Sequence, residues 1–142
     1  MRILVDTNVL IDVVTMREPF LVASVKIFEI CQEKVVMGAI AAHSISNMSY
    51  ILRKDFSRDK LREIFLNIFE VFRVEAVDFS KLLATVADDT FTDFEDCLQV
   101  QCAKSFRADY IVTRNVKDFS ASEIPAITPE DFFELEEVKS VL

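Results

Sequence analysis

The chain has 142 residues, of which 51% are hydrophobic, including 13 phenylalanines. This composition excludes a disordered chain, and the length suits one domain with its own core, so we expect a single domain over residues 1–142. One glycine and 3 prolines are too few for a turn-rich all-β protein. The 16 Lys and Arg against 24 Asp and Glu give a net charge of −8. This charge excludes a general polyanion-coating protein, but not a nuclease whose carboxylates hold metal ions.

The cysteines and the N-terminus bear on cellular location. Cys31, Cys97 and Cys102 are odd in number, form no CxxC pair and stand among apolar residues, so we expect reduced, buried thiols. Asp6 comes too early for the apolar region of a secretory signal, and no apolar run approaches the ~20 residues that span a bilayer. These features predict a cytoplasmic protein with no membrane partner.

Strands and helices alternate along the chain. Residues 3–5 predict a buried strand, followed by a short helix over 7–14 and a longer one from Glu18-Pro19 to Gln32. Residues 35–37 predict a second strand that ends at the only glycine, Gly38. A helix over 41–53, a helix capped by Ser57 and a strand over 71–77 follow. The remaining expected elements are a helix capped by Asp78 or Ser80, a helix over 92–104, strands at 110–112 and 126–127, and a last helix behind Thr128-Pro129.

This alternation predicts a mainly parallel sheet of about five strands with helices on both faces. Ligands of such sheets bind outside the carboxyl ends of the strands. Asp6 follows the first strand, whereas Asn115 and Asp118 follow the strand at 110–112. Asp96 lies on the helix between them, and Asp93 lies three residues earlier on the same helical face. We therefore expect these carboxylates to converge at one end of the sheet.

A carboxylate cluster needs protons or cations to relieve its repulsion. Two carboxylates about 4 Å apart repel by roughly 4 kcal/mol at an effective dielectric constant near 20. His43 is the only histidine, and the cysteines form no plausible thiolate set, so the chain has few of the ligands that zinc and copper prefer. Oxygen ligands suit Mg²⁺ or Mn²⁺, and such an ion activates water for phosphodiester cleavage.

Four ordered sequence blocks resemble the motifs of PIN-domain ribonucleases. They are Asp6-Thr7-Asn8-Val9-Leu10-Ile11-Asp12, the segment from Ser44 to Lys54, the segment from Asp93 to Gln99, and the segment from Asp109 to Phe119. The resemblance covers nearly the whole chain. It implies a three-layer α/β/α fold and metal-dependent endonucleolytic cleavage of RNA. It also implies a VapC-like toxin of a toxin–antitoxin pair, in a family whose members are often dimeric and neutralised by a small antitoxin.

The resemblance also assigns roles to residues. Asp6 matches the first acid, Asp96 the third and Asp118 the fourth, so these three are the expected metal ligands and catalytic residues. The family's second acid falls on Asn47, whose uncharged amide implies weaker metal binding. The expected supporting residues are Asn8, Asn47, Asp93, Thr113 and Asn115.

Several residues also have a plainer interpretation. An isolated Asp6 would serve as a helix cap, and Asp93 as a partner of the helix dipole. We expect Glu95 and Asp12 to be exposed, His43 to be structural, and the phenylalanines to pack in the core. The basic stretch that includes Arg53 and Lys54 is equally a solvated helix connection and an RNA track, whereas Arg114 and Lys117 are better placed to contact phosphate.

Two other functions compete with the nuclease. A PIN-fold module that binds RNA or protein without cleavage is the first alternative, because Asn47 weakens the site. An aspartyl-phosphate phosphatase is the second, but this chemistry normally needs an Asp two residues after the nucleophile, and Asn8 stands there.

Overall fold

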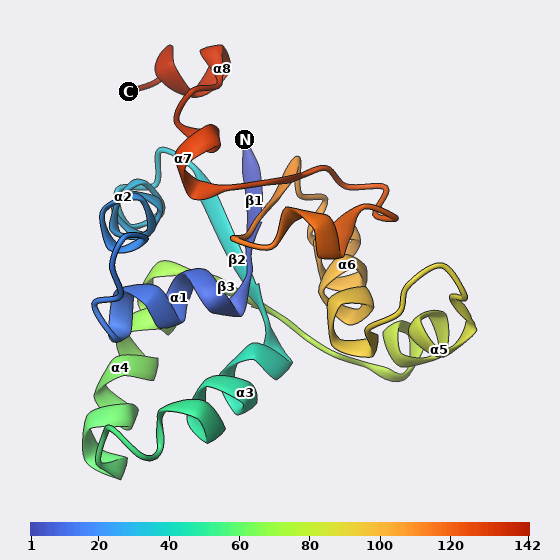
Figure 1. The fold of residues 1–142 in the computed structure, drawn as a ribbon, viewed down its shortest axis with the longest axis horizontal. Coiled ribbons are helices and arrows are strands. Elements are labelled where there is room, and N and C mark those ends of the chain that lie inside the picture. The colour runs from blue at the N-terminus through green and yellow to red at the C-terminus, as the bar shows by residue number, and fades with distance from the viewer.

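The computed structural model describes residues 1–142 and contains a five-stranded sheet in the order β3-β2-β1-β4-β5 (Figure 1). Every neighbouring pair of strands is parallel. At the centre, Ile3 of β1 is in register with Gly38 on one side and Tyr110 on the other. The strands are β1 (Arg2–Val5), β2 (Met37–Ala41), β3 (Arg73–Glu75), β4 (Tyr110–Val112) and β5 (Ala126–Ile127).

Helices cover both faces of this sheet, which confirms the three-layer α/β/α fold. Figure 1 shows one group on one side of the strands, namely α1 (Thr7–Val14), α2 (Leu21–Gln32), α3 (Ala42–Leu52) and α4 (Arg58–Val71). The opposite side carries α5 (Phe79–Ala87) and α6 (Phe94–Phe106). Three short elements complete the chain: the 3₁₀ helix η1 (Val116–Phe119), α7 (Pro129–Phe132) and α8 (Glu136–Lys139). No helix combines the length and apolar character needed to cross a membrane.

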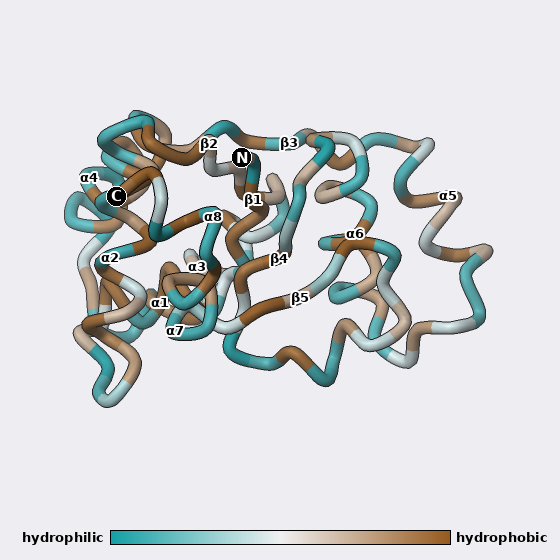
Figure 2. Tube along the Cα trace, turned by 90° about the horizontal axis from the view of Figure 1, so that it is seen from above, coloured by the Kyte–Doolittle hydropathy of each residue, from teal (hydrophilic) through white to brown (hydrophobic).

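The side-chain alternation of β1 creates two apolar cores. Ile3 and Val5 point into the larger core, which α1 to α4 complete. Leu4 points to the other face and packs among residues of β2, β4 and α6. Figure 2 shows the hydrophobic β1 and β4 in the middle of the molecule, between helices on either side. Because Ile3, Leu4 and Val5 are fully buried, the residue that follows them is held at the edge of the packed sheet.

Side-chain caps define several helix starts, as the sequence predicts. Ser57 accepts a hydrogen bond from the N–H of Lys60, and Thr128 accepts one from that of Asp131. Of the two caps proposed for α5, Asp78 is the one used. These contacts satisfy backbone donors that have no partner inside the helix.

The predicted end of β2 is wrong. Gly38 lies inside the strand, and the preceding turn contains Lys34 with a φ of 61°. A Cβ at position 38 would lie 2.6 Å from the Cys31 sulfur and 2.7 Å from the Phe72 ring. The glycine therefore permits close packing of α2 and the segment after α4 against the strand, and is not a turn signal.

Other boundaries differ by a few residues. Helix α2 begins at Leu21 because Pro19 lies in a turn, and α6 begins at Phe94 because Asp93 is its cap. Strand β3 covers only three of the predicted residues, and the last helix is divided into α7 and α8. The three cysteines are free and buried, as expected.

Candidate metal site

A polar cleft of about 550 Å³ lies at the carboxyl end of β1 and is lined by residues of α1, α3 and α6. Five of the predicted site residues line it together with one acid that was expected to be exposed, Glu95. Its lining residues include Asp6, Asn8, Asn47, Glu95, Asp96 and Asn115.

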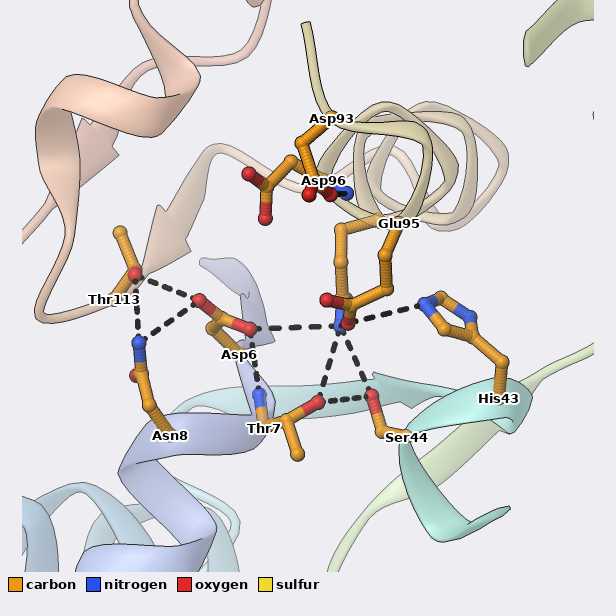
Figure 3. A network of polar contacts seen from close by, with 10 residues as sticks. Asp6, Thr7, Asn8, His43, Ser44, Asp93, Glu95, Asp96 and Thr113 are labelled. Atoms are coloured by element: carbon orange, nitrogen blue, oxygen red, sulfur yellow. Dashed lines mark hydrogen bonds and ion pairs between the residues drawn. The ribbon is translucent and has the colours of Figure 1, made fainter. Parts of the chain in front are cut away.

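Asp6 forms the floor of the site. It follows β1, caps α1 and is only 7% exposed. Its Oδ1 accepts a 2.7 Å hydrogen bond from the Thr7 N–H, and its Oδ2 accepts bonds from the Thr113 hydroxyl at 2.7 Å and the Asn8 amide at 3.2 Å (Figure 3). Burial is the main cause that raises the pKa of Asp6 to about 6, with repulsion from Glu95 and Asp118 acting in the same direction. Thr113 and Asn8 thus contact the acid that the sequence expects them to support.

Asp96 stands in the first turn of α6, opposite Asp6. Burial, followed by repulsion from Asp93, Asp118 and Asp6, raises its pKa to about 7. The Asp93 side chain accepts a 2.9 Å hydrogen bond from the Asp96 N–H, so Asp93 is the helix cap. Two acids with raised pKa values in one cleft are typical of a functional site.

Asp118 lies on η1 and is exposed. Its negative charge adds to the raised pKa of both Asp6 and Asp96, but Asp118 is not among the residues that line the cleft. Asn115 precedes η1, lines the cleft and donates its backbone N–H to the Thr113 hydroxyl at 3.0 Å. The structure thus brings Asp6 and Asp96 into one cleft, whereas Asp118 lies on η1, outside the lining of that cleft.

Glu95 is half-buried rather than fully exposed, and 42% of its side chain remains accessible to solvent. Its side chain is partly buried, with Oε1 lying 3.5 Å from the His43 Nε2 and 3.5 Å from the Gln99 amide. The neighbouring His43 does most to lower the pKa of Glu95, and hydrogen bonding from Gln99 and Asn47 lowers this pKa further. Carboxylate oxygens of Asp93, Glu95 and Asp96 lie within 4.8 Å of one another.

A buried polar layer below Asp6 was missed by the sequence analysis. Gln99 is fully buried, and its amide nitrogen, which has two hydrogens to donate, lies 3.0 Å from the Ser44 hydroxyl, 3.3 Å from that of Thr7 and 3.5 Å from Oδ1 of Asp6. The Thr7 hydroxyl also donates to that of Ser44 at 2.7 Å. This layer ties α1, α3 and α6 together. The available signal was a glutamine at an inward position of a largely apolar helix, because a buried amide needs partners.

The prediction that Asp12 is exposed is wrong, because this residue is fully buried. Its carboxylate lies 2.6 Å from Nε of Arg114, whose guanidinium also lies 4.5 Å from the centre of the Phe20 ring. Burial raises the pKa of Asp12, and the adjacent Arg114 opposes this. Arg114 therefore ties the segment after β4 to α1 and does not line the cleft, whereas Lys117 is exposed.

Arg53 and Lys54 lie at the exposed end of α3, outside the cleft. The Arg53 guanidinium lies 3.7 Å from the centre of the Tyr50 ring. A separate groove of about 650 Å³ runs between α3 and α4, and Arg53 lines it together with Arg58 and Arg62. Its apolar residues are Phe56, Leu61, Phe65, Leu66 and Phe69.

The donor set of the cleft fits a hard divalent cation. The acids offer only oxygen ligands, and the carbonyl oxygen of Gln99 is buried beside them without a hydrogen-bond donor. Burial raises the pKa of the Cys31 thiol to about 12, and none of the cysteines lines the cleft. Mg²⁺ and Mn²⁺ prefer such oxygen sites, and either ion would relieve the repulsion that raises the pKa values of Asp6 and Asp96.

Comparison with known proteins places this geometry in a family. A chain of the VapBC2 crystal structure from Rickettsia felis, solved bound to a DNA fragment from their promoter, has a similar fold, with a TM-score of 0.68. The likeness covers 90% of this chain and 98% of that one, at 13% sequence identity. No curated protein matches the sequence. The family model of the PIN domain matches residues 2–117. The chain therefore belongs to the PIN domain family.

Proposed function

We propose that this protein is a metal-dependent endoribonuclease and the toxin of a toxin–antitoxin pair in the cytoplasm. One observation carries the nuclease proposal: Asp6 and Asp96, from different elements, have raised pKa values in the same cleft at the carboxyl end of a PIN sheet. Membership of the PIN family and the likeness to VapBC2 support the same function.

In this proposal Asp6, Asp96 and Asp118 hold Mg²⁺ or Mn²⁺. The bound ion supplies an activated water and stabilises charge at the phosphorus during cleavage. The hydrogen bonds from Thr7, Thr113 and Asn8 keep the Asp6 carboxylate at one orientation without neutralising it. Lys117, exposed beside Asp118, offers a cation for an RNA phosphate.

The direct test is cleavage of structured RNA, and of a DNA of matched sequence, with Mg²⁺ or Mn²⁺ and with a chelator. We expect cleavage of the RNA only, stopped by the chelator and by either Asp6→Asn or Asp96→Asn. Because groups at one metal site act as a unit, the double variant should lose little more than each single one. RNA binding without metal-dependent cleavage would instead favour a binding module.

For the antitoxin we propose the groove between α3 and α4. Its apolar floor and three arginines, on a chain of net charge −8, suit an amphipathic helix with acidic residues. A small reading frame beside the gene, encoding such a helix, should yield a co-purifying partner. Charge reversal at Arg58 and Arg62 should weaken that complex, and size-exclusion chromatography will also show whether the chain alone forms a homodimer.

A further inference from the structure

The proposed nuclease lacks one negative ligand on α3. Asn47 stands where the four-block pattern places an acid, and its amide faces the cleft without a charge. Glu95 occupies this side of the cleft. Its carboxylate lies between Asp6 and His43 and projects from α6 toward the layer of Thr7 and Ser44 (Figure 3).

We propose that Glu95 supplies the missing carboxylate as a ligand of the divalent ion, and that His43 and Asn47 hold it in position. This inference rests on the proposed function, because it concerns the same metal site. The second negative ligand then comes from α6 instead of α3, and α3 supplies the residues that orient it.

Helix geometry explains how two adjacent acids serve one site. Consecutive helical residues project about 100° apart, so Glu95 and Asp96 leave α6 in different directions. After burial, Asp96 is affected most by Asp93, the cap of its own helix, and then by Asp118 on η1, Asp6 and Glu95. Glu95 is affected by His43 and Asn47, on the α3 side. Glu95 repels Asp6, and Asp6 in turn repels Asp96.

A purely structural role accounts poorly for this arrangement. A glutamine at position 95 could still accept a hydrogen bond from the Gln99 amide and would not repel Asp6, although it would lose the charged contact with the His43 Nε2. The carboxylate instead adds negative charge beside a buried acid, which destabilises the metal-free protein. A cation that Glu95 and Asp6 share converts this repulsion into attraction.

The test is Mn²⁺ binding by isothermal titration calorimetry, together with melting temperature in EDTA. We compare the wild type with Glu95→Gln, Asn47→Glu, the double variant of these two and Asp6→Asn. Glu29→Gln on the exposed face of α2 is the matched control for the loss of one charge. Glu95→Gln should weaken Mn²⁺ binding by at least about tenfold, since the charge of the ligands tunes affinity for hard cations. It should leave the melting temperature in EDTA unchanged or higher.

The double variant is the decisive measurement. Asn47→Glu returns a carboxylate to α3, so it should recover Mn²⁺ affinity lost in Glu95→Gln. The inference would be overturned if Glu95→Gln bound Mn²⁺ as tightly as the wild type and Glu29→Gln do. It would also be overturned if the double variant bound Mn²⁺ no better than Glu95→Gln alone.

The experiments distinguish failure of the proposed nuclease function from failure of the Glu95 ligand assignment. If the wild type binds Mn²⁺ and Glu95→Gln weakens it, but no RNA is cleaved, the ligand assignment stands and the nuclease does not. If RNA cleavage needs Asp6 and Glu95→Gln binds Mn²⁺ normally, the nuclease stands and Glu95 is not a ligand. A wild type that binds no Mn²⁺ would refute both.

Discussion

Replacing Asp6 by Asn removes a buried charge and keeps the shape of the side chain, so its effect on the metal-free protein should depend on pH. Burial raises the pKa of Asp6 from 3.8 to about 6 in the folded protein. An acid with a raised pKa binds its proton more tightly when folded. Its contribution to stability is therefore most favourable below pH 3.8 and is lost as the pH rises through about 6.

The magnitude follows from the size of this shift. At about pH 7.5 the whole shift counts against folding, roughly 3 kcal/mol, whereas at about pH 4.5 the cost is roughly 1 kcal/mol. The asparagine avoids this cost but loses part of the hydrogen bonding from Asn8 and Thr113, worth about 1 kcal/mol. We expect Asp6→Asn to be about 2 kcal/mol more stable than the wild type at about pH 7.5, and nearly equal to it at about pH 4.5.

Urea unfolding in EDTA, followed by far-ultraviolet circular dichroism at both pH values, measures this difference. Asp55→Asn, at an exposed position, is the control for the loss of one carboxylate. The two proteins share all other titrating groups, so the difference between them isolates Asp6 and its influence on Asp96. A variant that is less stable at both pH values would show that Asp6 is chiefly a structural cap, and an equal effect at both would refute the role of its charge.

Three further outcomes are expected. Gly38→Ala should destabilise the protein by about 1–3 kcal/mol in urea unfolding, because the new methyl overlaps Phe72 and a neighbouring sulfur; a neutral result would refute the packing argument. Asp12→Ala should cost about 3 kcal/mol by leaving Arg114 without its buried partner, and adding Arg114→Met should recover part of this loss; strict additivity would contradict their coupling. The rise in melting temperature on adding Mn²⁺ should shrink between about pH 7.5 and pH 5, because protons compete for the two acids with raised pKa values; a constant rise would place the ion elsewhere.

The sequence predicts most of the fold because its strongest signals are local. Ile3–Val5 ends at an acid, Ser57 and Thr128 can cap helices, and strands alternate with helices, so the layers follow from short-range patterns. Gly38 shows the limit of such patterns. Position 38 must be glycine because the Cys31 sulfur and the Phe72 ring, from other elements, leave no room for a Cβ. From the sequence alone, the glycine suggests only a turn.

The same limit applies to the site. The acids at strand ends can be located because parallel strands share one carboxyl edge. The sequence alone predicts Glu95 and Asp12 in solvent because a charged residue on a helix usually lies there. Their partners, His43 and Arg114, come from segments far away in the sequence. The side of the helix that each charge faces is decided by these distant groups.

The sheet order has a consequence for synthesis of the protein. Strand β1 is made first, but one of its two neighbours is β4, which is made after more than one hundred residues. Until Tyr110–Val112 leaves the ribosome, β1 lacks a partner along one edge, the Asp6 N–H lacks its acceptor on Val112, and the Thr113 hydroxyl is absent from Asp6. A growing chain therefore cannot assemble the site. The cleft can be completed only after Tyr110–Val112 and Thr113 have been synthesised, and a product truncated before β4 should lack the site.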